Sequence, residues 1–317
     1  MKVNAEKFTA FCWAFPLSCI GLLLLSYAVG GDQQFYRAFY ENIQGLSLAD
    51  GFYAYKNQLG TSEPGYFLVV YLVSEWLPKD VVFSIVNFIF YYQLFLWLLR
   101  HNVSQLLFPL LVCNFYLLVL SFSAERLKLS LAIFLVAYSL RGVLKYALLG
   151  FSLISHVQVI LLLIGTQVEA ALHVLRRLVR GRVGLGFLSL LLTVVCVAAL
   201  LLLLREHIES KLSYYYGAWG GPAAVVKPLV FMAMAIFYSR GRGAEAFLAS
   251  LPMVLASFFI GSERVVIFSY FVFMYYAAPY RRGLNIGVLA SALFFAYNGI
   301  HFLMRMIEFG DGFAGIY

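Results

Sequence analysis

The sequence predicts an all-α, polytopic integral membrane protein, and three observations support this class. The 317 residues are 63% hydrophobic and 12% charged, with a mean hydropathy of +0.86, whereas the apolar share of a water-soluble domain is nearer ~45–50%. Many of the apolar runs approach the ~20 residues that a helix needs to cross a bilayer. Lys and Arg, the source of a formal net charge of +8, gather in short clusters between these runs. Such clusters are typical of cytoplasmic anchoring, so the basic charge requires no nucleic-acid partner.

The first apolar run, residues 8–29, follows Lys2 and Lys7. Because it is longer than the ~7–15-residue core of a signal peptide, we expect an uncleaved first span and a cytoplasmic N-terminus. Residues 30–62 then form a translocated loop that is low in Lys and Arg and rich in Tyr and Phe. Interfacial anchoring explains these aromatic residues, and a platform for stacking sugars is the alternative.

The segment 66–77 decides the topology, because it is too short to be a full span. If it crossed the membrane, Arg100-His101 and the Arg141/Lys145 pair would face outward, against the positive-inside rule. We therefore expect a half-helix that returns to the outer side, which makes Arg100 cytoplasmic. A second short segment, 146–155, rises to His156. Short helices that dip into a bilayer need protein or water around their ends, so they tend to line cavities.

The whole chain is then predicted to hold ten full spans and two short membrane-dipping helices. The sequence contains no inverted repeat and no linker rich in Pro, Ser or Gly, so we expect a single transmembrane domain over 1–317, with larger periplasmic loops at 30–62 and 205–222. The cysteines lie inside apolar segments without metal-like spacing. The predicted full spans are 8–29, 81–99, 103–122, 127–140, 157–172, 185–204, 223–238, 244–260, 265–278 and 286–306.

The motif TSEPGY at 61–66 places Glu63 directly before a proline and an apolar run. Pro in the first helical turn loses no backbone bond, and a carboxylate suits the positive end of the helix dipole. Glu63 is therefore either a simple N-terminal cap or a functional carboxylate at the membrane entry point.

Other ionisable groups gather on the same predicted side. Arg126 follows Glu125, and Arg264 follows Glu263; since neighbours in a helix point ~100° apart, neither pair closes on itself. Each pair is either part of a structural ion pair with another residue or a guanidinium fork for a phosphate.

His156 is either a satisfied histidine at a helix end or a general acid or base. Lys227, His301 and Arg305 lie in apolar runs toward the same side and are weaker candidates for lining one cavity. No GxSxG, HExxH or Walker motif occurs, so serine hydrolases, zincins and NTPases lack their signatures.

Three motifs in this order resemble the EpsG-like family of bacterial polysaccharide polymerases, relatives of the Wzy-type O-antigen and capsule polymerases. They are Glu63-Pro64-Gly65-Tyr66 before a short apolar segment, Arg126 with the run RLKLSLA, and Ser155-His156 opening an apolar helix. The resemblance covers roughly residues 30 to 170, and later only Glu263-Arg264 is similar. The family usually has Arg-Gln and Phe-His-Ser, where this chain has Arg126-Leu127 and Ser155-His156-Val157-Gln158.

This resemblance implies a polymerase of the bacterial inner membrane. It would transfer a growing glycan from undecaprenyl diphosphate onto a lipid-linked repeat unit at the periplasmic face. A chain-length regulator and a flippase of the same pathway are the implied partners. No metal or other cofactor is expected, since Arg or Lys stabilises a departing diphosphate electrostatically. The expected catalytic residues are Glu63, Arg126 and His156, and the expected substrate-binding residues are Asp32, Tyr36, Tyr66, Lys227, Arg264 and Arg305.

Other functions remain open at this point. A polyprenyl-phosphate-sugar glycosyltransferase would use an acidic residue of the first outer loop, Asp32 or Asp50, often with a divalent metal. A glycan flippase or transporter would need charged groups near mid-membrane, and the clustering on the outer side argues against it. A membrane acyltransferase using His156 is a further alternative.

Overall fold

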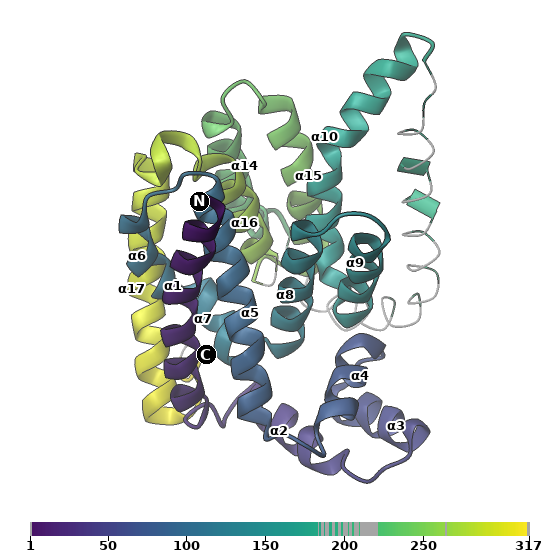
Figure 1. Ribbon diagram of the computed structural model, residues 1–317, viewed down its shortest axis with the longest axis vertical. Coiled ribbons are helices and arrows are strands. Elements are labelled where there is room, and N and C mark those ends of the chain that lie inside the picture. Colours follow the sequence, from purple (N-terminus) through teal and green to yellow (C-terminus); the bar gives the residue numbers. More distant parts are fainter. Residues whose placement is uncertain are drawn as a thin grey trace. The chain divides into compact units, whose positions relative to one another are not determined.

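The computed structural model describes residues 2–182, 221–263 and 265–315, and isolated residues between 183 and 220. In these residues every regular element is a helix (Figure 1). Six helices are long and apolar enough to cross a membrane, or seven if one bent pair counts as a span. The multi-pass helical class is therefore confirmed, and the predicted count of ten is not. The six are Val3–Leu25, Lys79–Arg100, Val157–Val179, Gly221–Tyr238, Gly243–Ile260 and Tyr280–Phe309.

Three predicted spans are shorter or broken. Residues 103–122 form η1 (Gln105–Leu107), α6 (Phe108–Val112) and α7 (Phe115–Phe122), with a bend of 54°. The break follows from Asn114, whose side chain accepts a hydrogen bond from Tyr116 N–H at 3.0 Å and so caps a new helix. The helices α8 (Glu125–Ser139) and α16 (Val266–Ala277) have 15 and 12 residues, fewer than the ~20 of a full span. The predicted span 185–204 falls largely outside the described residues.

The chain divides into two compact units, residues 1–159 with 281–317, and residues 160–280. The second unit contains α10 (Ile160–Val179), α13 (Gly221–Ala224), α14 (Val226–Tyr238), α15 (Gly243–Ile260) and α16. In it α10 packs on α15, and α14 packs on both α15 and α16. The polar loop expected at 205–222 belongs almost wholly to the part that the structure does not describe.

In the first unit, α1 (Lys2–Leu25) and α5 (Lys79–Arg100) run antiparallel. The ring of Trp13 lies 6.1 Å from that of Phe95, and Ser84 Oγ donates a hydrogen bond of 2.6 Å to the carbonyl of Ser18. The end of α5 therefore lies beside the start of α1. This places Arg100 at the end of the unit where the chain begins.

The long helix α17 (Ile286–Phe309) fixes the same two ends. Before it begins, the backbone carbonyl of Arg282 accepts a hydrogen bond from the N–H of Ser104, a residue that follows the end of α5. Where it ends, the carbonyl of Gly310 accepts hydrogen bonds from Val29 and Gly30, which follow α1. Basic residues around Arg100 and Arg282 thus share one end of the unit, as the topology prediction requires.

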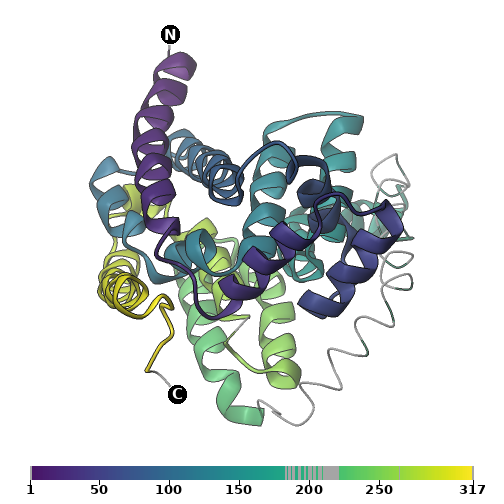
Figure 2. The same ribbon diagram turned by 90° about the horizontal axis from the view of Figure 1, so that it is seen from below.

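Three short helices lie at the opposite end, where α1 stops and α5 starts (Figures 1 and 2). They are α2 (Asp32–Asn42), α3 (Leu48–Leu59) and α4 (Pro64–Val73). At ~1.5 Å per residue α4 is about 15 Å long, half of a ~30 Å bilayer core. The second short segment forms α9 (Val143–Ser155), of 13 residues. Both expected short segments are thus short apolar helices.

Candidate functional site

The loop that leads into α4 presents Glu63 to the interior of the first unit. Glu63 is the N-cap residue of α4 and Pro64 begins the helix, but the side chain makes no capping hydrogen bond. The carboxylate points elsewhere and is 1% exposed. Simple capping, the first alternative for this residue, therefore does not describe what its side chain does.

The Glu63 carboxylate joins three segments that are far apart in sequence. Its Oε2 lies 3.1 Å from Arg126 Nη1 in α8 and 3.0 Å from His156 Nδ1 after α9. Its Oε1 accepts a hydrogen bond of 2.8 Å from Val157 N–H. The structure thus brings together the three residues expected to be catalytic, with Arg126 and His156 both within hydrogen-bonding distance of Glu63 Oε2. We call Glu63, Arg126 and His156 the charged triad.

These contacts determine the protonation of Glu63, which lies outside the candidate membrane-spanning helices. Burial alone would raise the pKa of this carboxyl, but His156, Arg126 and Val157 N–H favour the charged form more strongly. The pKa is lowered from 4.5 to about 2. Glu63 is consequently ionised at every physiological pH, and such a carboxylate is a weak proton acceptor.

Gly65 permits this arrangement. A Cβ at this position would lie 2.3 Å from Ser155 Oγ and 2.7 Å from Ser155 N. The start of α4 and the end of α9 therefore touch through backbone, and only glycine fits. The glycine of the TSEPGY motif is what lets His156 reach Glu63.

The guanidinium of Arg126 has a second partner. Its Nε donates a hydrogen bond of 3.2 Å to the hydroxyl of Tyr36, from α2. Arg126 and His156 keep 17% and 15% of their side-chain surface exposed, whereas Glu63 keeps 1%. The triad is therefore buried at its carboxylate and accessible at its two nitrogen-bearing side chains.

A second ion pair lies next to the triad and is more deeply buried. Lys79 Nζ, at the start of α5, pairs with Glu125 Oε1 and also donates to Gln33 Oε1 at 2.7 Å. The other carboxylate oxygen of Glu125 accepts a hydrogen bond of 3.0 Å from the Tyr66 hydroxyl. Glu125 is fully buried, and Tyr66 is too. Tyr66, expected to bind substrate, therefore positions Glu125 instead of meeting the surface.

A third basic side chain completes this region. Lys128, fully buried one turn along α8, donates a hydrogen bond of 2.9 Å to the carbonyl of Ser121. Lys79 and Lys128 both lie over the ring of Phe83, at 5.4 and 5.2 Å from its centre. An aromatic face stabilises such cations where water is absent.

Sequence reasoning missed Lys79 and Lys128. A usable signal existed for Lys79, because a cation at a helix N-terminus opposes the helix dipole and lies on the predicted outer side. Such a placement indicates a buried acidic partner, which the structure shows to be Glu125. Lys128 carried a signal as well, because it is a lysine within the predicted span 127–140, and a charged group inside a span needs a partner.

The other expected site residues belong to several elements of the two units. Asp32 is exposed in the first turn of α2, and Arg305 is half-buried in α17. His301 packs its ring against Tyr297, at 4.5 Å between centres. Lys227 is exposed in α14 of the second unit. Glu263, which follows α15 in the same unit, is exposed too. Arg264 is outside the described residues.

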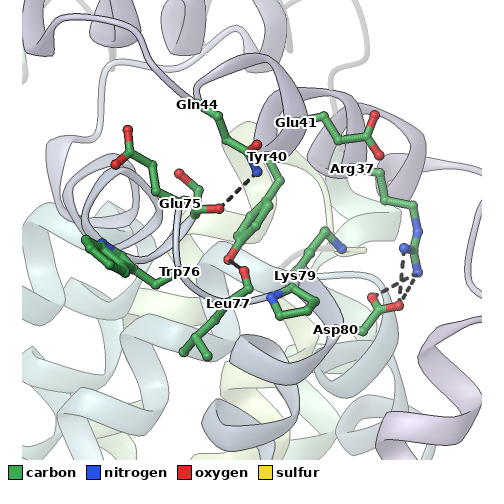
Figure 3. A pocket seen from close by; sticks show the side chains of 11 residues that line it. Arg37, Tyr40, Glu41, Gln44, Glu75, Trp76, Leu77, Lys79 and Asp80 are labelled. Atoms are coloured by element: carbon green, nitrogen blue, oxygen red, sulfur yellow. Dashed lines mark hydrogen bonds and ion pairs between the residues drawn. The ribbon is translucent and has the colours of Figure 1, made fainter.

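A cavity of about 470 Å³ opens beside the second ion pair (Figure 3). Lys79 lines it, together with residues of α2 and of the turn between α4 and α5.

In the described part of the chain, no group of three or more His, Cys, Asp or Glu residues is arranged to hold a metal ion. The triad offers a carboxylate, an imidazole and a guanidinium as its chemical groups.

Comparisons with protein-family models, with curated proteins and with solved structures find no match to this chain.

Proposed function

We propose that this protein is a membrane glycosyltransferase of the polysaccharide polymerase type, which transfers a glycan from a polyprenyl diphosphate to a lipid-linked acceptor sugar. The observation that carries this proposal is the single contact in which Glu63 binds both Arg126 and His156. The motifs that resemble the EpsG-like family contribute one member each to this contact. The predicted topology puts the contact on the periplasmic side.

The geometry suggests that His156, with Glu63 as its orienting partner, is the general base. Glu63 has a low pKa and accepts a hydrogen bond from the Nδ1 side of the imidazole. In the neutral tautomer that this bond selects, Nε2 carries the lone pair that accepts a proton. Nε2 lies 3.3 Å from Gln158 Oε1. In this neutral tautomer the amide is turned so that its N–H donates to Nε2, and the acceptor hydroxyl takes the place of Gln158 in the reaction. Glu63 is then the positioning group of His156 and not itself the base.

Arg126 is suited to the leaving group. Glu63 and Tyr36 each engage part of its guanidinium, and the remaining N–H groups form a planar fork that matches phosphate oxygens. Lys79 and Lys128 are buried, and Lys79 is paired with Glu125, whereas Arg126 keeps 17% of its side-chain surface exposed. The guanidinium of Arg126 is therefore the cation that a diphosphate would meet.

The proposed step moves the glycan from a phosphate oxygen to the oxygen of the acceptor hydroxyl. His156 Nε2 takes the proton of the acceptor hydroxyl while the oxygen forms a bond to the anomeric carbon of the donor glycan. The bond from that carbon to the phosphate oxygen breaks, and the electron pair leaves with the diphosphate. Arg126 stabilises the charge that develops there.

The test is a deletion strain complemented with variants. We expect the deletion to accumulate glycan of a single repeat unit, and the wild-type gene to restore polymer. Arg126→Lys keeps the charge but loses the fork, so it should give chiefly single-repeat glycan at normal protein level. His156→Asn should do the same.

Arg205→Lys is the matched control, because Arg205 forms an exposed pair with Glu209 and such pairs contribute little. Polymer of normal length in the deletion strain would refute the proposed function. Normal polymer in both triad variants would leave only a structural ion pair.

A further inference from the structure

The cavity beside Lys79 differs in chemistry from the charged triad. It lies between α2 and the turn that joins α4 to α5, and its volume of about 470 Å³ is within the ~300–1,000 Å³ of ligand pockets. Figure 3 shows Tyr40, Glu41 and Gln44 from α2 together with Glu75 and Trp76 from the turn. None of these five residues belongs to the triad or to its second ion pair.

Hydrogen bonds between the two walls hold the cavity in shape. The hydroxyl of Tyr40 donates to the carbonyl of Leu77 at 2.7 Å, and Gln44 Nε2 donates to the carbonyl of Ser74 at 2.9 Å. Both bonds fasten the turn to α2 over residues that are about 30 positions or more apart. A ligand would thus find a preformed site and not have to order the turn.

The cations of the cavity are already engaged. Arg37 binds Asp80 at 3.0 Å and the carbonyl of Leu25 at 2.6 Å. Lys79 is paired with Glu125. These basic groups are therefore compensated within the protein and do not make an anion site.

Two acidic side chains are among the residues that line the cavity. Glu41 and Glu75 are exposed on its two walls, and Glu75 Oε1 accepts a hydrogen bond of 3.3 Å from Gly45 N–H. Ionised carboxylates accept hydrogen bonds and cannot donate them, so they repel phosphate and suit hydroxyl groups. Beside them the side chain of Trp76 is large, aromatic and 80% exposed.

We propose that this cavity binds the uncharged, hydroxyl-rich sugar part of the substrate. Glu41 and Glu75 accept hydrogen bonds from sugar hydroxyls, and the indole of Trp76 packs on the apolar face of a sugar ring. Only the identity of the natural ligand rests on the proposed function. Binding of a sugar chain is measurable without any polymerisation.

The probe is the oligosaccharide that mild acid releases from the lipid-linked intermediates of the producing cells. Its binding to the full-length protein in nanodiscs is measured by calorimetry, for wild type, for Glu41→Gln/Glu75→Gln and for Trp76→Ala. The controls are Glu308→Gln and Tyr146→Ala, an exposed carboxylate of α17 and an exposed aromatic residue of α9. We expect at least tenfold weaker binding in both cavity variants and unchanged binding in both controls.

The proposal is overturned if wild type does not bind the oligosaccharide, or if the cavity variants bind it as wild type does. It is also overturned if Trp76→Ala only lowers the amount of inserted protein while the purified variant binds normally, because Trp76 is then an interfacial anchor. The two proposals fail separately. If the oligosaccharide binds with the expected variant pattern but deletion of the gene leaves polymer unchanged, this site is kept and the polymerase is refuted. If deletion abolishes polymer but the oligosaccharide does not bind, the polymerase is kept and this site is refuted.

Discussion

Replacing Glu63 by glutamine should lower stability by an amount that depends on pH in a defined direction. The pKa of this carboxyl is lowered from 4.5 to about 2 in the folded protein, and each unit of difference corresponds to about 1.4 kcal/mol. The ionised carboxylate therefore contributes about 3 kcal/mol near neutral pH. Glutamine keeps an oxygen for Val157 N–H but removes the charge that pairs with Arg126 and orients His156.

The direction follows from the lowered pKa. The contribution is fully present above the unfolded-state value of about 4.5 and is lost as pH falls toward about 2. The measurement is the free energy of unfolding in mixed detergent at pH 7, 5, 4 and 3, taken as wild type minus Glu63→Gln so that other carboxyl groups cancel. We expect a difference of about 3 kcal/mol at pH 7 that falls to less than half of this value by pH 3.

Glu308→Gln is the matched control, because Glu308 is exposed near the end of α17. Its difference from wild type should stay within about 0.5 kcal/mol at each pH. A difference for Glu63→Gln that is close to zero, or that does not change from pH 7 to pH 3, would refute the argument that the triad holds this carboxylate in its ionised form.

Two further predictions concern the contacts around the triad. Gly65→Ala should push α4 away from Ser155, lower stability by about 1–3 kcal/mol and reduce polymerisation. Gly150→Ala is the control and should be neutral or slightly stabilising, because its Cβ would meet open space. Equal effects of the two variants on thermal unfolding would contradict the close approach of α4 to Ser155. Lys79→Met should lower the free energy of unfolding by about 3–5 kcal/mol, because Glu125 stays buried without its cation. Adding Glu125→Gln should restore part of that loss. A double variant that loses as much stability as the sum of the two single variants would show that the pair is not coupled.

The sequence was informative where charge and chain length restrict the possibilities. The short segment after Glu63 was expected to be a half-helix, because a crossing there would reverse the side of every later basic cluster. The structure has the ten-residue α4 on the side where α5 begins. The joint placement of Glu63, Arg126 and His156 was likewise expected from topology, which brings residues to one side of a membrane without any knowledge of packing.

What the sequence could not supply depends on packing. Apolar runs do not reveal that Asn114 starts a new helix or that α8 and α16 stop short of a full span, because an interior of protein tolerates ends that lipid would not. Tyr66 was expected to bind substrate, and only the fold shows that its hydroxyl donates a hydrogen bond to Glu125. Arg264 and the predicted span at 185–204 stay predictions.

The hydrogen bond between Glu63 and His156 joins residues that are 93 positions apart. A ribosome that adds ~5–20 residues per second needs roughly 5–20 s to cover this distance. During that interval Glu63 has entered the membrane region while Arg126 and His156 are still being made. Until α8 is made, the nascent chain carries this carboxylate without Arg126 and His156, and a protein that ends before α8 would lack both partners.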